Sequence, residues 1–157
     1  MSKSQILRSE VSRETTLHIR DTCLCLHVQR AARAMARRFD DALRPLDLTH
    51  GQFSLLTSLN RPLPARLGAV AEVLAMDRTT LTAALKPLER RGLIDVGVDP
   101  NDKRGRILTL TRQGKRLLAA AVPVWKRTHA RIDRDLGNAD PDVLRRDLRA
   151  LSAPDQD

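Results

Sequence analysis

Apolar residues recur at steps of three and four along the first third of the chain, which predicts a long amphipathic helix. The repeat is clearest from Leu24 to Leu43, and the predicted helix runs from about Thr16 to Leu43. Pro45 marks its end, because proline lacks the amide hydrogen that a continuing helix needs.

The last third of the chain shows the same spacing. It predicts a helix from about Arg112 to Leu136, with Thr111 as its N-cap and Gly137 at its end. A final helix follows Asp140-Pro141, an N-cap with proline at the first helical position, and its apolar stripe runs from Val143 to Leu151.

The middle of the chain predicts three shorter helices. Thr49 precedes the first and has Gln52 three residues on, which is a capping-box pattern. Leu67 to Leu74 forms the second, and Asp77 caps a third from about Arg78 to Arg91.

A β-hairpin is predicted next. Ile94 to Val98 alternates apolar and polar positions, and Arg106 to Thr111 returns with β-branched residues. The turn chemistry lies in Asp99-Pro100-Asn101-Asp102. The predicted fold is therefore mainly α with a small β-hairpin.

Composition narrows the class of protein. Aromatic residues make up 2% of the 157 positions, so a module that stacks bases on aromatic platforms is not expected. Two cysteines are too few for a disulfide scaffold, which favours a reducing, cytoplasmic location. No run approaches the ~20 apolar residues of a membrane span, and Met1 to Ser12 has no apolar stretch of signal-peptide type.

The positive charge concentrates in the middle of the chain. The formal net charge is +9, and residues 61–116 hold 12 basic and 6 acidic side chains, against 16 and 13 in the rest. This indicates a central module that binds a polyanion. A merely soluble surface is the alternative, and charge alone leaves the two about even.

Two short helices joined by a tight turn and followed by a basic hairpin make a winged helix-turn-helix. The second helix should present short polar and basic side chains to the DNA major groove, and the hairpin should reach a minor groove. The expected DNA contacts are Arg78, Thr79, Thr80, Thr82 and Lys86 on the helix, and Lys103, Arg104 and Arg106 in the hairpin loop. In the alternative without DNA binding, Thr79 and Thr80 only cap the first turn of the helix, and the winged helix contacts another protein.

Four segments resemble the MarR family of bacterial transcription regulators, and the resemblance runs from about Cys23 to Leu151. They are Asp77-Arg78-Thr79-Thr80-Leu81-Thr82, Leu88-Glu89-Arg90-Arg91-Gly92-Leu93-Ile94, Asp99-Pro100-Asn101-Asp102-Lys103-Arg104 and Leu108-Thr109-Leu110-Thr111-Arg112-Gln113-Gly114. Pro87 departs from the family pattern in the recognition helix.

The resemblance implies one MarR-like domain over residues 1–157. Dimerisation helices would occupy about 16–48 and 112–152, and a winged helix-turn-helix lobe about 49–111. It also implies a homodimer on a pseudo-palindromic operator, usually as a repressor. Arg104 would enter the minor groove while Asp102 orients it.

The resemblance further implies release from DNA by a small effector, often aromatic or anionic. Met35, Phe39, His50 and Phe53 are candidate pocket residues, and they suit an ordinary core equally well. The sequence does not identify the effector, the operator, or the direction of regulation.

Cys25 supports an alternative, a redox-sensing regulator. It matches the reactive cysteine of the family's organic-hydroperoxide sensors, but Gln29, Phe39 and His50 stand where those proteins have tyrosines. A small core cysteine is the commoner case. On a helix, Cys23 and His27 share a face while Cys25 points elsewhere, so one subunit cannot gather all three around a metal. A metal site shared across the dimer is the alternative, and no cofactor is predicted.

Two other classes of protein are alternatives to a specific regulator. A module that coats DNA without sequence preference would need only phosphate contacts, not the base-reading set on the helix. An enzyme is not expected, because no nucleophile, base and orienting group recur at recognisable spacing. The predicted partners are therefore double-stranded DNA, a second copy of the chain and a small-molecule effector.

Overall fold

The computed structural model describes residues 10–153, so most of Met1–Ser12, where no signal peptide was expected, lies outside them. The chain divides into two compact units, residues 1–35 and residues 36–157. Among the described residues, no helix is both long and apolar enough to cross a bilayer.

The predicted first helix is two helices, which corrects the single span from Thr16 to Leu43. Helix α2 covers Arg13–Thr22 and helix α3 covers Leu24–Leu43, with an extended residue, Cys23, between them. The hydroxyl of Thr22 donates to the carbonyl oxygen of His18 at 2.7 Å. A threonine that bonds back to the preceding turn weakens helix continuation, which the apolar spacing alone does not reveal.

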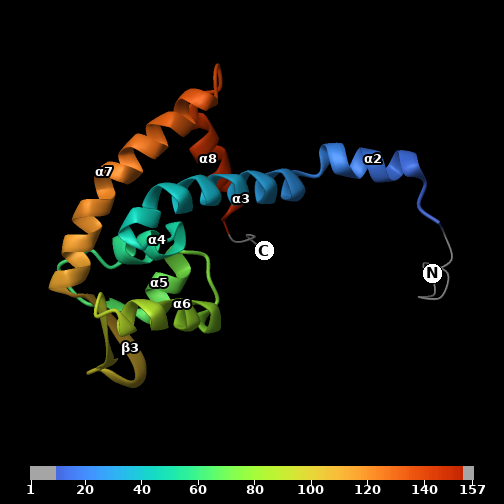
Figure 1. Ribbon diagram of the computed structural model, residues 1–157. Helices are drawn as coiled ribbons and strands as arrows, with labels where there is room; N and C mark the ends of the chain where they lie inside the picture. Colours follow the sequence, from blue (N-terminus) through green and yellow to red (C-terminus); the bar gives the residue numbers. More distant parts are fainter. Residues whose placement is uncertain (1–9, 154–157) are drawn as a thin grey trace, which may run out of the picture. The chain divides into compact units, whose positions relative to one another are not determined.

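The second unit contains the remaining helices (Figure 1). They are the 3-10 helix η1 (Arg44–Leu46), α4 (His50–Ser58), α5 (Leu67–Val73), α6 (Arg78–Arg90), α7 (Arg112–Asp135) and α8 (Pro141–Leu151). The predicted N-caps are confirmed: the side chains of Thr49, Asp77, Thr111 and Asp140 each accept a first-turn amide. Gly92 and Gly137 have φ of 66° and 61°, the left-handed conformation that ends a helix without a Cβ penalty.

A three-stranded antiparallel sheet joins the helices. Its strands are β1 (Ala65–Arg66), β2 (Ile94–Asp99) and β3 (Asp102–Leu110), in the order β1-β3-β2. The β2–β3 hairpin was predicted, whereas β1 was not, because two residues are too few to show a period of two. β1 pairs Ala65 with Leu108 and so attaches the start of α5 to the hairpin.

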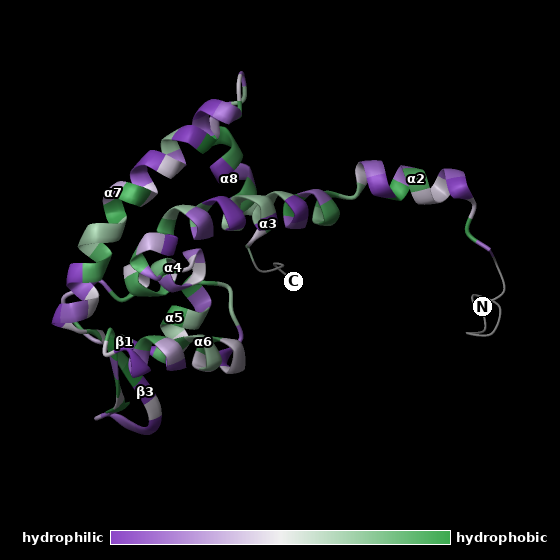
Figure 2. Ribbon diagram, viewed as in Figure 1, coloured by the Kyte–Doolittle hydropathy of each residue, from purple (hydrophilic) through white to green (hydrophobic). Residues whose placement is uncertain are grey.

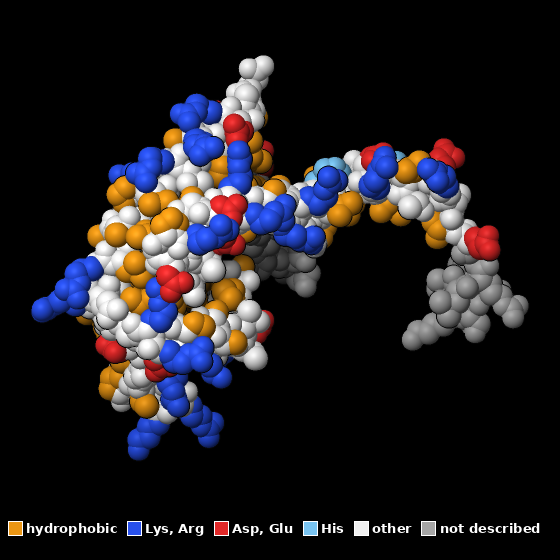
Figure 3. Space-filling model, viewed as in Figure 1, with side chains coloured by type: hydrophobic (Ala, Val, Ile, Leu, Met, Phe, Trp, Pro, Cys, Tyr) orange, Lys and Arg blue, Asp and Glu red, His pale blue; other side chains and the backbone are white. Residues whose placement is uncertain are grey.

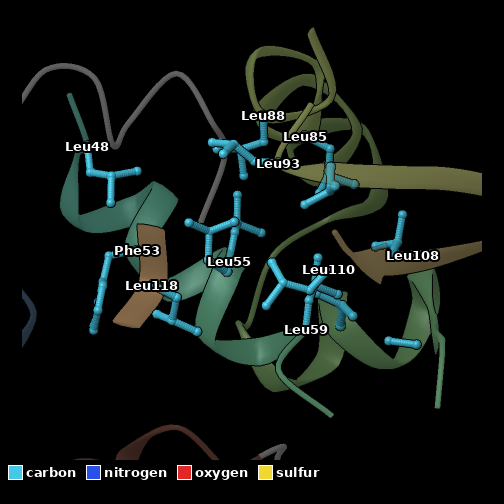
Figure 4. Packing of buried hydrophobic residues seen from close by; sticks show 14 of the residues in the cluster. Leu48, Phe53, Leu55, Leu59, Leu85, Leu88, Leu93, Leu108, Leu110 and Leu118 are labelled. Carbon is cyan, nitrogen blue, oxygen red and sulfur yellow. The ribbon is translucent and has the colours of Figure 1, made fainter. Parts of the chain in front are cut away.

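A leucine-rich core holds this unit together (Figure 4). Leu56 of α4, Leu81 and Leu88 of α6, and Leu108 of β3 are each at most 1% exposed. Since a buried leucine stabilises a fold by about 1.5–3 kcal/mol relative to exposure, this cluster fixes how α6 sits against the sheet.

Helix α8 contributes nothing to that core. None of its residues is buried, and its apolar side chains Val143, Leu144 and Leu151 are 39%, 39% and 64% exposed. Hydrophobic and hydrophilic residues alternate along α7 and α8 (Figure 2). An aspartate of α7, Asp133, accepts from Arg145 of α8 at 2.9 Å and ties the two helices together.

Candidate nucleic-acid interface

Helix α6 turns its polar side outward because its leucines face the core. Leu81, Leu85 and Leu88 are buried, whereas the five predicted contact residues are exposed. Those five are Arg78, Thr79, Thr80, Thr82 and Lys86. The outward side therefore presents hydroxyls and cations within three turns of helix.

The first turn of α6 is held by Asp77. Its carboxylate accepts from the amide of Thr80 at 2.8 Å and from the hydroxyl of Thr80 at 2.6 Å. The hydrogen bond from the Thr80 hydroxyl has the largest effect, and together with the amide bond it lowers the pKa of Asp77 below its ordinary value. The carboxylate that caps the helix therefore stays ionised.

Two of the predicted contact threonines already donate within the helix. Thr80 donates to Asp77, and Thr82 donates to the carbonyl oxygen of Arg78 at 2.7 Å. The hydroxyl oxygens of these two threonines can still accept hydrogen bonds from base donors, and their methyl groups can still contact thymine methyls. Arg78, Lys86 and the hydroxyl of Thr79 are then the donors on this side.

Arg78 lies across the start of α5. A Cβ added at Gly68 would stand 3.2 Å from Nη2 of Arg78, so the guanidinium lies close to the backbone of α5 at this glycine. The Arg78 side chain therefore passes close to α5 at the start of α6.

The basic hairpin residues fall within the span of strand β3, where the sequence predicts a loop. Arg106 is paired with β2, whereas Lys103 and Arg104 lie in an irregularity of the pairing beside the turn. The turn is Pro100 and Asn101, because Asp99 pairs with Asp102. The register then shifts, so that Val98 pairs with Arg106 and residues 103–105 have no partner in β2. Lys103, Arg104 and Arg106 are exposed on the strand beside this turn. Lys and Arg side chains project from the end of the molecule where β3 lies (Figure 3).

Asp102 bonds the main chain of Arg104. Its Oδ1 accepts from the amide nitrogen of Arg104 at 3.0 Å. The contact fixes the backbone from which the Arg104 side chain extends into solvent.

Sequence reasoning missed an ion pair beside the turn of the hairpin. Among residues 10–153, Asp99 is the one charged residue that is buried, with 4% exposed. Its Oδ2 lies 2.9 Å from Nε of Arg66 in β1. Asp99 was assigned only to the turn, and no local pattern reveals a partner 33 positions earlier.

A cavity of about 600 Å³ lies between α4, the end of α5 and α7. His50 and Phe53, two of the predicted pocket residues, line it with Lys115, Leu118 and Trp125 of α7. The rings of Phe53 and Trp125 stack with centroids 6.3 Å apart. The wall is thus mainly apolar, with a cation near the start of α7.

The other two candidate pocket residues lie elsewhere. Phe39 is buried in the core, with its ring 4.9 Å from that of His50, and is not part of the lining. Met35 is 37% exposed and belongs to the first unit. Burial lowers the pKa of His50, an effect that the carboxylate of Asp40 partly opposes.

Cys25 is exposed on α3 rather than packed in a core. Its Sγ accepts from the side-chain amide nitrogen (Nε2) of Gln29 at 3.2 Å, and Oε1 of Gln29 in turn accepts from Arg33 at 2.7 Å. Cys23 and His27 meet only through the carbonyl oxygen of Cys23, 2.8 Å from Nδ1 of His27.

Comparison with known proteins identifies the family to which the chain is similar. A family model described as MarR family matches residues 48–105. The transcriptional regulator HosA of Escherichia coli O111:H- is 35% identical over 78 residues, which cover 50% of this chain and 58% of HosA. The organic hydroperoxide resistance transcriptional regulator of Bacillus subtilis (strain 168) is 30% identical over 101 residues, covering 64% of this chain and 69% of that protein.

Solved structures extend the likeness beyond the matched segment. The transcriptional regulator MosR of M. tuberculosis, in complex with DNA, is 34% identical, with a TM-score of 0.75 over 82% of this chain and 92% of MosR. BpsR of Bordetella bronchiseptica, whose structure concerns regulation of DNA binding by 6-hydroxynicotinic acid, is 26% identical, with a TM-score of 0.73 over 85% and 96%. These proteins are regulators by name, not enzymes. The chain therefore belongs to the MarR family of transcriptional regulators.

Proposed function

We propose that the chain is a sequence-specific DNA-binding repressor that acts as a homodimer and leaves its operator when a small molecule binds. One observation carries the proposal: the exposed polar side of α6 and the basic β3 residues are held on one core. Such an arrangement suits simultaneous contact with a major groove and a neighbouring minor groove.

The relatives support the DNA partner. MosR was solved with DNA, and it is similar to this chain over most of both lengths. The match covers 58% of HosA, so HosA supports the proposal over only part of its own length.

The apolar residues on α8 support a second copy as partner. Three of them remain at least 39% exposed on a helix that buries nothing within the chain. Helix α3 exposes Leu24, Val28 and Met35 in the same way. Terminal helices with unburied stripes are typical of a helical dimer interface.

Selection from a random duplex library tests the function. The protein should enrich one pseudo-palindromic sequence, protected as two half-sites about one helical turn apart. Affinity should fall ~10³–10⁵-fold between 50 and 200 mM salt as counterions are released from ~6–10 phosphates. A single unpaired footprint would contradict the symmetric dimer, and no enrichment would favour a DNA-coating module.

The cavity between α4 and α7 supports a small aromatic anion as effector. Its apolar wall suits a ring, and Lys115 suits a carboxylate. BpsR, whose DNA binding is regulated by 6-hydroxynicotinic acid, offers a precedent.

Trp125 allows a direct binding test, because it is the chain's single tryptophan and lines the cavity. Benzoate and related aromatic acids should change its fluorescence saturably. Lys115→Gln should weaken binding of the acids but not of benzamide. If acids and amides bind the variant as they bind the wild type, Lys115 is not the anchor.

Cys25 supports a second candidate, release by oxidation. Its sulfur is exposed, and the chain resembles an organic hydroperoxide resistance regulator. Mild peroxide should then lower operator affinity reversibly in wild type but not in Cys25→Ser, whereas Cys23→Ser keeps the response. Equal responses in wild type and Cys25→Ser would exclude this route.

A further inference from the structure

Beside the turn of the hairpin lies a buried carboxylate, that of Asp99, with both oxygens engaged. Oδ2 of Asp99 contacts Nε of Arg66, and Oδ1 accepts from the amide of Asn101 at 2.9 Å. The Asp99 side chain is 5% exposed, while that of Arg66 is 68% exposed. A buried carboxylate without partners would be costly, so this arrangement favours one geometry of the turn.

The backbone of Arg66 is held by two elements. Its backbone pairs with Ile107 of β3 and also forms the N-cap of α5. The preceding residue, Ala65, is 1% exposed. The helix-turn-helix and the hairpin tip are therefore joined through one ion pair as well as through the sheet.

The contacts continue from Asp99 toward Arg104. A Cβ at Gly105 would stand 3.1 Å from Cβ of Asp99 and 3.1 Å from the carbonyl oxygen of Asp102, so this part of the tip is closely packed. Asp102 then fixes the amide of Arg104. A displacement of Asp99 would therefore move the neighbouring backbone at Gly105 and Arg104.

We propose that Arg66 and Asp99 form a positioning pair that sets the angle of the hairpin tip and so directs Arg104 toward DNA. The inference rests on the proposed DNA-binding function and adds two residues that need not touch DNA themselves. Arg66 acts through Asp99, and Asp99 acts through the turn.

Hydrogen exchange of the free protein tests the pair without any DNA. Asp99→Asn keeps the shape and the acceptor for Asn101 but removes the charge, and Arg66→Met keeps most of the stem. Both should speed exchange of amides 101–106 severalfold while leaving α6 amides unchanged. Asp95→Asn, on an exposed position of the same strand, is the matched control.

Unchanged exchange at amides 101–106 in both variants would overturn the proposal. Arg66→Met changes an exposed side chain, so the test survives even if Asp99→Asn folds poorly. Because no DNA is present, this result is independent of whether the wild type binds an operator.

Operator binding then separates positioning from direct contact. Asp99→Asn and Arg66→Met should each weaken specific binding about tenfold, and the double variant should be no weaker than either alone. In an Arg104→Ala background, Asp99→Asn should add little. A larger loss in Arg66→Met than in Asp99→Asn, with a shallower salt dependence, would show that Arg66 binds a phosphate and would overturn the assignment.

Discussion

Arg104 illustrates how a residue near a turn gains a fixed starting point. Asp102 bonds its amide and Gly105 packs against Asp99, so the backbone is ordered while the side chain is exposed. An exposed arginine on an ordered backbone loses less freedom on binding than one on a loose loop.

Arg104→Ala should therefore weaken operator binding by ~1–3 kcal/mol if the side chain makes a specific contact. Titration of the selected operator measures the loss. Arg127→Ala, which removes an exposed arginine from α7, is the charge-matched control. Equal affinities for the two variants would place the hairpin outside the groove.

His50 links stability to pH. Burial lowers its pKa below the ordinary value of 6.5, so the unfolded chain binds more protons than the folded protein between the two pKa values. The free energy of unfolding should then rise with pH across that window, and this contribution is lost as the pH falls below about 6.5.

Urea unfolding at pH 7 and at about 5.5 checks this sign. The wild type should be less stable at the lower pH, and His50→Gln should lose less stability than the wild type. His18→Gln, on exposed α2, should behave as wild type. If His50→Gln loses as much stability at the lower pH as the wild type does, another group causes the pH dependence.

At the scale of elements, the sequence predicted what local chemistry determines. The caps at Thr49, Asp77, Thr111 and Asp140 are side-chain-to-backbone contacts within three residues, and all four are present. Leucine spacing likewise indicated the buried side of α6.

Long-range contacts could not be predicted in this way. Strand β1 exists because β3 lies beside Ala65, and Asp99 is buried because Arg66 reaches it. The cavity needed Trp125 and Lys115, which stand far from Phe53 in the chain. Single-sequence periodicity contains no information on which distant segments meet.

The start of α7 packs directly onto the hairpin base at Gly114. A Cβ there would stand 2.1 Å from the carbonyl oxygen of Leu93 and 2.7 Å from Cδ1 of Leu110. Since one obstacle is backbone, a methyl group requires α7 to move.

Gly114→Ala should lower the free energy of unfolding by ~1–3 kcal/mol or more, as overpacking does. In Gly51→Ala, by contrast, the new Cβ meets only Thr49 Oγ1 at 3.9 Å within helix α4. That control should be neutral or stabilising, because alanine favours helix by ~0.5–1 kcal/mol over glycine. Comparable urea midpoints for Gly114→Ala and wild type would show that α7 is not held here.

At the scale of the whole molecule, the proposal requires two copies. Leu144→Glu places a charge in the α8 stripe and should shift sedimentation equilibrium toward monomer and abolish operator binding. Arg149→Glu introduces the same side chain roughly 140° around the helix, and it should leave the dimer intact. An unchanged dimer in Leu144→Glu would remove α8 from the interface.

The central claim is sequence-specific DNA binding, and one binding isotherm tests it most directly. Wild-type protein is titrated with the selected operator and with a scrambled duplex of equal length at near-physiological salt. We predict a preference of ~10³-fold or more for the operator. Equal affinity for the two duplexes would contradict the account, because α6 would then provide phosphate contacts without reading bases.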